Sequence, residues 1–375
     1  MSSILMCFAT NLIGWSRYLA VLILAIGLAG CSDPGPQHHN LIEADLPEPL
    51  RGSEQVAVDL DRADPIAVEP DFVMGDTMKS DGIFLAQPMD MIVVGDSIYI
   101  ADVKQHAIVV ADLRGRLIRL IGGQGQAPGE FTEPARLAAN DDFIFVYDHG
   151  NRRVQVFDHR FEYITSISHG FMWLRQSIVA DDDQLFLPES VMSDSLMVAV
   201  HTARQPFQKE GGFMPRLLPP GQQPMAHNTS VVTTDGSNVC SAYIGLPYVF
   251  CFDNDLSEQR TLVFNGGVVE NLNNPLPSQI EFSGDESTSI RPFVMGFALR
   301  DDMLFLASHE SPIYIISLKT NRLLGMLPLP ASGIVDQIHV GDERLLLLMG
   351  VSGYRRVYAY DVVHILNELH QEAPT

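Results

Sequence analysis

Hydrophobic residues recur along this chain in short runs separated by turns rich in Gly, Asp and Asn, and the pattern repeats. Residues 75–112 and 122–158 show the same landmarks in the same order, with a period of 46 residues. Repetition at such a period is typical of stacked supersecondary units. Three spacings are kept in both units: Gly75–Phe84 and Gly122–Phe131, Pro88–Asp102 and Pro134–Asp148, and Asp102–Asp112 and Asp148–Asp158.

Each unit contains four apolar runs with turn signals between them, which is the pattern of four antiparallel strands. In the first unit the runs are Met91–Val94, Ser97–Ala101, Ala107–Ala111 and Leu117–Ile121. The second run is apolar at successive positions, so both of its faces must be buried, as they are between the stacked blades of a propeller. Later segments fit four more units, of which the last offers only three runs.

The expected fold is all-β: a six-bladed β-propeller of four-stranded antiparallel blades over residues 61–363. The sixth unit lacks an outer strand, and Pro65–Met74 precede the first unit where such a strand is needed. An N-terminal strand in that place would close the ring and remove the edges of an open sheet. A seventh blade would need a unit that the sequence does not contain.

The N-terminus has the pattern of an export signal. Residues 1–30 carry one charged side chain, Arg17, followed by an apolar run over Tyr18–Leu28 that is shorter than the roughly 20 residues of a spanning helix. Leu28-Ala29-Gly30-Cys31 resembles a bacterial lipobox, in which the cysteine is acylated and the chain is cut before it. The resemblance implies a signal peptide over residues 1–30 and lipidation at Cys31, with palmitate-like chains as the anchor. The alternatives are an uncleaved anchor or a signal without lipid.

Two further segments flank the expected propeller. Residues 31–60 are rich in Pro and polar residues and are predicted to form a flexible tether, and residues 364–375 a C-terminal tail. Ser32 follows the lipobox cysteine, and a residue other than Asp there favours sorting to the outer membrane in Gram-negative bacteria. The expected location is the cell envelope, on the outer membrane facing the periplasm, with the membrane as one partner.

The balance of acidic and basic residues excludes one class of binding partner. Residues 31–375 contain 46 acidic residues and 23 Lys and Arg, which are the 24 of the whole chain less Arg17. A surface so acidic repels nucleic acid, so no nucleic-acid partner is expected. The chain also lacks a nucleophile elbow, an HExxH motif, a phosphate loop and a paired-cysteine metal motif.

Residues 122–157 resemble the NHL repeat. The matching residues are Gly123, Gly125, Pro128-Gly129, Phe131, Pro134, Val146, Asp148, Asn151-Arg152 and Val154-Gln155-Val156-Phe157. The first unit matches in part, with Gln105-His106 in place of Asn-Arg. The resemblance implies a propeller, but it says little about function, because NHL-like propellers include enzymes, ligand binders and interaction scaffolds.

Several residues of the repeats are expected to have structural roles. Asp148 is placed to accept hydrogen bonds at a strand end, and Asn151 to adopt the left-handed conformation of a tight turn. If Gly245-Leu246 is a two-residue turn, Cys240 and Cys251 face each other across one ladder. A disulfide and two buried free thiols both remain open for that pair. The histidines of the equivalent turns, predicted to be solvated rather than metal ligands, are His106, His149 and His309.

The mouth of the central channel is the candidate binding site. First strands line the axis of a propeller, so residues at their starts should ring one opening. A ring of arginines in an acidic protein suits an anion or carboxylate, and the alternative is ordinary polar lining of the channel. The candidates are Asp90, Arg136, Trp173, Arg175, Asn228, Arg291 and Asp336.

The leading functional hypothesis is a binding or scaffolding module without catalysis. It would present its loop face to a protein, peptide or envelope ligand, helped by two long insertions, residues 203–227 and 265–290. No cofactor is expected under this hypothesis. The alternative is a lactonase-like propeller hydrolase or lyase with a divalent metal, calcium for example, in the channel. Asp90 and Asp336 could serve as ligands, but no Glu lies on a first strand and the arginines would oppose a cation.

Overall fold

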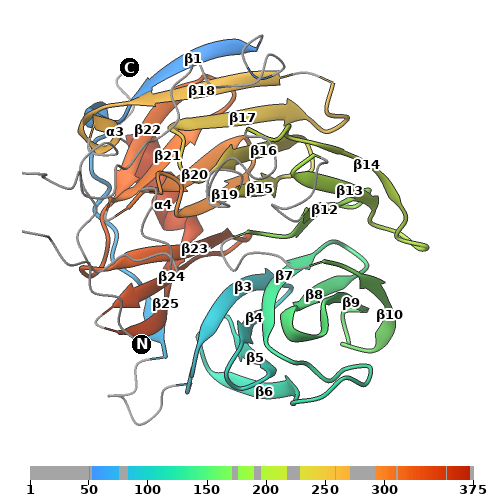
Figure 1. Cartoon of the computed structure of the whole chain (residues 1–375). Helices are drawn as coiled ribbons and strands as arrows, with labels where there is room; N and C mark the ends of the chain where they lie inside the picture. The colour runs from blue at the N-terminus through green and yellow to red at the C-terminus, as the bar shows by residue number, and fades with distance from the viewer. Residues whose placement is uncertain are drawn as a thin grey trace, which may run out of the picture. The chain divides into compact units, whose positions relative to one another are not determined.

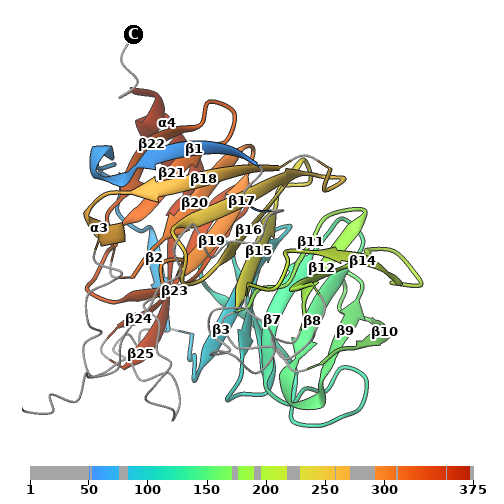
Figure 2. The same ribbon diagram turned by 45° about the horizontal axis from the view of Figure 1, so that its top comes forward.

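The computed structural model describes residue 50 and residues 53–75, 83–170, 176–189, 196–217, 229–257, 259–270, 292–309, 311–351 and 353–371. These residues form six sheets arranged as blades around an axis (Figures 1 and 2). The innermost strand of each blade contacts the innermost strand of the next, and the sixth contacts the first, so the ring is closed. The predicted all-β, six-bladed propeller with four-stranded antiparallel blades is confirmed.

The first two blades contain the strands that the 46-residue repeat predicts. Blade one consists of β3 (Pro88–Val94), β4 (Ser97–Asp102), β5 (Ala107–Asp112) and β6 (Leu117–Gly122). Blade two consists of β7 (Pro134–Ala139), β8 (Ile144–Asp148), β9 (Arg153–Phe157) and β10 (Tyr163–Ser168). The second strands are buried at every position except the first of β4, as their unbroken apolar sequence requires.

The remaining blades follow the same order from axis to rim. Blade three is β11 (Val179–Ala180), β12 (Gln184–Pro188), β13 (Val198–Thr202) and β14 (Lys209–Phe213). Blade four is β15 (Ser230–Thr234), β16 (Asn238–Tyr243), β17 (Tyr248–Asp253) and β18 (Gln259–Asn265). Blade five is β19 (Gly296–Arg300), β20 (Met303–Ala307), β21 (Ile313–Ser317) and β22 (Arg322–Leu327). Blade six has β23 (Ile334–Val340), β24 (Arg344–Val351) and β25 (Tyr354–Asp361).

An N-terminal strand completes blade six. Strand β2 (Phe72–Met74) pairs antiparallel with β25, with Phe72 opposite Ala359 and Met74 opposite Val357. This is the ring closure that the sequence predicts. Because β2 and β25 come from opposite ends of the propeller, their ladder joins the two ends of the ring without a covalent link.

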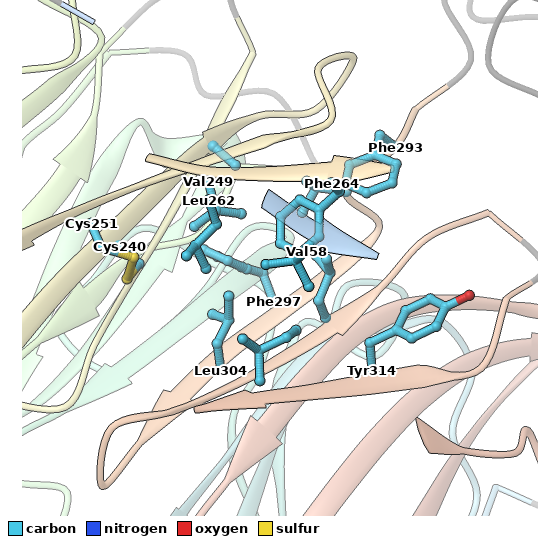
Figure 3. Close-up of a cluster of buried hydrophobic side chains, with 14 of the residues drawn as sticks. Val58, Cys240, Val249, Cys251, Leu262, Phe264, Phe293, Phe297, Leu304 and Tyr314 are labelled. Carbon is cyan, nitrogen blue, oxygen red and sulfur yellow. A yellow bond between two sulfur atoms is a disulfide. The ribbon is translucent and has the colours of Figure 1, made fainter. Parts of the chain in front are cut away.

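The prediction of a flexible tether over residues 31–60 is wrong for residues 54–60, which have regular structure. Strand β1 (Glu54–Asp59) pairs in parallel with β18 as a fifth strand of blade four, and the short helix η2 (Leu60–Arg62) follows it. Val58 and Leu60 are only 4% and 2% exposed and pack in one cluster with Phe264 and Phe293 (Figure 3). The segment is a strand because Val56 and Val58 alternate with more exposed residues, so one face can be buried.

Two other segments differ from their predictions. Residues 209–213, predicted to lie in an insertion, form β14, the outer strand of blade three. Residues predicted as the start of a C-terminal tail belong to helix α4 (Val362–Gln371), which begins at the end of β25. Val362 and Ile365 lie three positions apart on one helix face and are buried against blades five and six. The short helix α3 (Gly267–Glu270) follows β18.

The hydrophobic core is divided among the interfaces between neighbouring blades. The cluster between blades four and five, for example, joins Leu262 of β18 to Leu304 of β20 and Tyr314 of β21. No helix among the described residues is long and apolar enough to cross a membrane.

Candidate functional site

The six innermost strands β3, β7, β11, β15, β19 and β23 line a central cavity of about 140 Å³. An innermost strand is the free edge of its blade, so its backbone N–H groups need partners from outside the blade. Polar side chains of neighbouring blades meet this need around the cavity. Ser177 Oγ accepts from Val232 N–H at 3.0 Å, and Thr233 Oγ1 accepts from Leu299 N–H at 3.0 Å.

Asp90 makes the same kind of bond between blades one and two. One carboxylate oxygen accepts from Met91 N–H and the other from Leu137 N–H, both at 2.9 Å. Burial raises the pKa of Asp90 to about 6, although Arg136 and the two N–H groups act in the opposite direction. The carboxyl therefore holds two blades together at a cost in desolvation.

Arg136 links three blades. Its guanidinium donates to Met89 O of blade one at 2.6 Å and to Ala135 O of its own blade at 3.0 Å. Its Nε donates to the carbonyl of Gln176, which precedes β11 of blade three. Because the side chain is almost fully buried, these backbone carbonyls replace water around its charge.

Asp336 pairs with an arginine that the sequence did not single out. Arg355 Nε lies 2.9 Å from Asp336 Oδ2 in blade six, and the same guanidinium donates to Pro88 O of blade one at 3.1 Å and to Met89 Sδ. Arg355 and Arg136 therefore both contact Met89, from opposite sides of blade one. In the sequence, Arg355 is an ordinary residue near a hairpin turn. Its contact with Pro88 forms only because blade six packs against blade one.

Three of the seven predicted mouth residues, Asp90, Arg136 and Asp336, thus come together at the starts of β3, β7 and β23. The other four, Trp173, Arg175, Asn228 and Arg291, lie outside the described residues, as does Cys31. Asp90 and Arg136 make contacts between blades, whereas Asp336 pairs with Arg355 of its own blade, whose guanidinium reaches blade one. These contacts favour the interpretation as a polar lining that stiffens the ring.

His339 lines the same cavity at its other end. Its Nε2 accepts from Val93 N–H at 3.0 Å, so the ring is neutral with its proton on Nδ1. Burial lowers the pKa of His339 to about 4. Among the described residues, no three His, Cys, Asp or Glu side chains are placed together so that they could hold a metal ion.

The raised pKa of Asp90 predicts a pH-dependent stability. The folded state binds this proton more tightly than the unfolded chain, so stability from this group is present below pH 4 and is lost as pH rises to about 6. A rise of this pKa from 3.8 to about 6 corresponds to about 3 kcal/mol. The stability of the wild type relative to Asp90→Asn should fall by about that amount between pH 4 and pH 7 in urea denaturation. A difference that stays constant over this range would show that Asp90 does not titrate there.

The NHL-like residues form one hydrogen-bond network around Asp148. This buried carboxylate accepts from Thr132 N–H at 2.7 Å, from Asn151 Nδ2 at 2.7 Å and from Arg153 Nε at 2.9 Å. Gln155 Nε2 adds a longer bond of 3.3 Å. The network ties the loop before β7 to the turn after β8, which supports the structural reading of the motif.

One detail of the motif prediction is wrong. The residue of this turn with left-handed backbone is Arg152, with φ of 54°, and not Asn151. The side-chain amide of Asn151 instead donates hydrogen bonds to Asp148 and to the carbonyl of Gly125. His106 occupies the same position in blade one with φ of 52°, and its Nδ1 accepts from Glu133 N–H at 3.2 Å. His106 is therefore engaged in a blade-to-blade contact.

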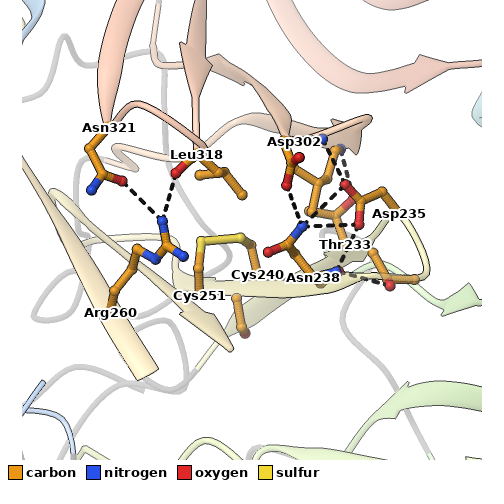
Figure 4. The surroundings of a disulfide bond; sticks show 12 residues. Thr233, Asp235, Asn238, Cys240, Cys251, Arg260, Asp302, Leu318 and Asn321 are labelled. Atoms are coloured by element: carbon orange, nitrogen blue, oxygen red, sulfur yellow. Dashed lines mark hydrogen bonds between the residues drawn. A yellow bond between two sulfur atoms is a disulfide. The ribbon is translucent and has the colours of Figure 1, made fainter. Parts of the chain in front are cut away.

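Cys240 and Cys251 lie opposite each other on β16 and β17, the register that a turn at Gly245-Leu246 predicts. They are joined by a disulfide with their Cα atoms 4.1 Å apart (Figure 4). Polar contacts between blades four and five lie on both sides of it. Arg260 donates to Leu318 O at 2.6 Å, and Asn238 Nδ2 donates to Asp302 Oδ1 at 2.8 Å.

The two most exposed large hydrophobic side chains of the described residues lie on the face with the blade-to-blade connections. Phe84, in the connection that leads into blade one, is 63% exposed, and Tyr354, at the β24–β25 hairpin, is 62% exposed. Tyr354 is the neighbour of Arg355, whose guanidinium reaches blade one at Pro88. The connection face therefore carries exposed aromatic side chains in the connection that leads into blade one and in blade six.

Six blades around a polar-lined channel define this protein as a six-bladed β-propeller. The chain belongs to the family DUF5128, described as 6-bladed beta-propeller, whose pattern matches residues 79–270. No curated protein is similar enough in sequence to match.

Two solved structures illustrate the fold. A Bacteroides fragilis protein described as exported has a TM-score of 0.52 and 12% identity, over 82% of this chain and 98% of that chain. U3-55K has a TM-score of 0.51 and 13% identity, over 75% of this chain and 97% of that chain. Identities this low establish similarity of fold alone.

Proposed function

We propose that this protein is an exported, lipid-anchored binding or scaffolding module that presents the connection face of its propeller to a protein, peptide or envelope ligand. The observation that carries the proposal is the exposure of Phe84 and Tyr354 on that face. Exposed aromatic side chains on connections of a rigid scaffold are typical anchors of protein–protein contacts. The Asp336–Arg355 pair, whose arginine follows Tyr354 in the chain, adds polar groups that can orient a ligand.

The anchor is the lipid expected on Cys31, and the NHL-like repeats are part of the same proposal. The fold similarity to a Bacteroides fragilis protein described as exported supports an extracytoplasmic location. Export also suits the Cys240–Cys251 disulfide, because disulfides persist in oxidising compartments.

The alternative, a propeller hydrolase or lyase with a metal in the channel, receives less support from the geometry. A calcium ion needs several oxygen ligands that face it. Both oxygens of Asp90 accept backbone N–H groups, and the guanidinium of Arg136 lies close enough to Asp90 to influence its pKa. A cation there would have to displace these bonds and oppose that charge.

Photocrosslinking in bacterial cells tests the binding face. A photoreactive amino acid placed at Phe84 or at Tyr354 should give a discrete adduct of higher mass on illumination. The same amino acid at Asp255, in the hairpin between β17 and β18 on the opposite face, serves as the matched control. Adducts at Asp255 equal to those at Phe84 and Tyr354, or none at any position, would contradict the proposed face.

A further inference from the structure

The outer strand of blade one has an unusual surface. Leu117, Ile118 and Leu120 of β6 are each 54% exposed, and they are the one group of large exposed hydrophobic side chains within a single described strand. The outer strands of the other blades are less apolar at their exposed positions. On β22, for comparison, Leu324 is 38% exposed, while Leu323 is partly buried and Gly325 is buried.

The backbone of β6 is also available for pairing. β6 is the last strand in the sheet order β3-β4-β5-β6, and within the described residues no strand pairs with its outer side. The corresponding edge of blade four shows what such an edge can accept, because β1 lies along β18 there with six residues in register. Extended chain therefore fits the rim of this propeller in β geometry. On β6 the register is regular over Arg119–Gly122, and Ile118 before it forms a bulge.

The charge around β6 is opposite to that of the whole chain. Arg114, Arg116 and Arg119 lie within six residues, in a protein with 46 acidic and 24 basic residues. Arg116 pairs with Asp112, whereas Arg119 is exposed within the strand. Charged side chains often protect an edge strand from aggregation, which explains the arginines but not the three exposed aliphatic side chains between and beside them.

From these features we propose that β6 is a second binding surface, separate from the connection face, which pairs with an extended segment of an acidic partner protein that carries alternating apolar residues. Backbone pairing would supply affinity, the leucines would receive the apolar side chains, and Arg119 would select for carboxylates. A second copy of this chain fits poorly, because antiparallel pairing of two β6 strands brings their arginines together.

A membrane surface is also less favoured as the occupant. The chain enters the propeller through β1 on blade four, which lies across the six-membered ring from blade one. A lipid-anchored chain thus reaches its propeller on the side opposite β6. The exposed residues of β6 are then placed for a partner other than the bilayer that holds the anchor.

The test uses the full chain purified in detergent and a fluorescent seven-residue peptide of alternating Glu and Val. Fluorescence anisotropy should show binding that weakens with salt, and at least tenfold weaker binding by Arg119→Glu and by Leu120→Glu. The matched variants on blade five, Arg322→Glu and Leu324→Glu, should bind as the wild type does. Amide hydrogen exchange should slow over residues 117–122 when the peptide is present.

Other outcomes overturn the proposal. These are absence of peptide binding by the wild type, equal weakening by the β6 and β22 variants, and self-association that Arg119→Glu alters. Arg119-dependent binding to phosphatidylglycerol vesicles in place of the peptide would assign β6 to a membrane surface instead. The β6 variants leave Phe84 and Tyr354 intact, so crosslinking at the connection face remains an independent readout.

Discussion

Replacing Asp148 by Ala is expected to lower the free energy of unfolding by about 3–5 kcal/mol, the usual loss when one partner of a buried ion pair is removed. The variant would leave the Arg153 guanidinium and Thr132 N–H without their carboxylate. It would also free the loop before β7, which Asn151 helps to hold against blade two. Urea denaturation of the purified protein measures the loss directly.

A second aspartate of blade two provides the control. Asp158 accepts N–H groups of Arg160 at 2.9 Å and Glu162 at 2.8 Å, but in a solvated hairpin. Asp158→Ala should cost about 1 kcal/mol, as is usual for an exposed hydrogen-bonded turn. Equal losses for the two variants would mean that Asp148 is an ordinary turn residue and that its network adds nothing.

The second large effect is expected at the segment that adds the fifth strand to blade four, which consists of β1 and the short helix η2 that follows it. Leu60→Ala should lower the free energy of unfolding by about 2–4 kcal/mol, because it leaves a cavity in the cluster around Phe264 and Phe293. Removal of all residues before 61 should cost more, since it also exposes Phe264 and the edge of β18. Thermal and urea unfolding of the shortened and the full chain would measure both losses.

Glu54→Ala in the adjoining strand β1 is the matched control, because the Glu54 side chain is exposed. It should change stability by less than about 0.5 kcal/mol. A shortened chain that is as stable as the full chain would show that residues 54–60 behave as the tether that the sequence predicts.

The repeats made most of the fold predictable. Runs such as Ser97–Ala101 and Phe143–Tyr147 are apolar on both faces, and only stacked sheets bury both faces of so short a strand. The spacing between Pro134 and Asp148 is fixed because the Asp148 carboxylate accepts a hydrogen bond from Thr132 N–H, in the loop that precedes the same blade. In blades one and two, the local sequence pattern therefore predicts the tertiary contacts that the structure shows.

Other parts depended on contacts that no local pattern reveals. Val56 and Val58 alternate correctly for a strand, but they follow a Pro-rich segment, and their partner β18 lies some two hundred residues away. Arg355 reaches the channel mouth only because ring closure brings blade six against blade one. Val362 and Ile365 form too short an apolar stripe to identify α4 without the surface that it covers.

At the candidate site, the sequence predicted the position of the polar residues better than their role. Asp90, Arg136 and Asp336 do gather where first strands begin, because innermost strands share one direction around the axis. The sequence left two roles open for their side chains, a ligand site and an ordinary polar lining of the channel. The unpaired edges of those strands take up polar groups to satisfy backbone N–H and C=O, a demand that is visible only once the blades are assembled.

Native mass spectrometry of the full protein, extracted from bacterial membranes without chelator and compared with an EDTA-treated sample, tests the proposed lipid-anchored binding module most directly. The account predicts a chain that begins at Cys31, carries the mass of its acyl chains and holds no divalent ion, with the same mass and melting temperature after EDTA. An unprocessed or unlipidated chain would contradict the anchor. A divalent ion that is lost with EDTA, together with a fall in melting temperature, would contradict the binding role and favour the metal-dependent enzyme.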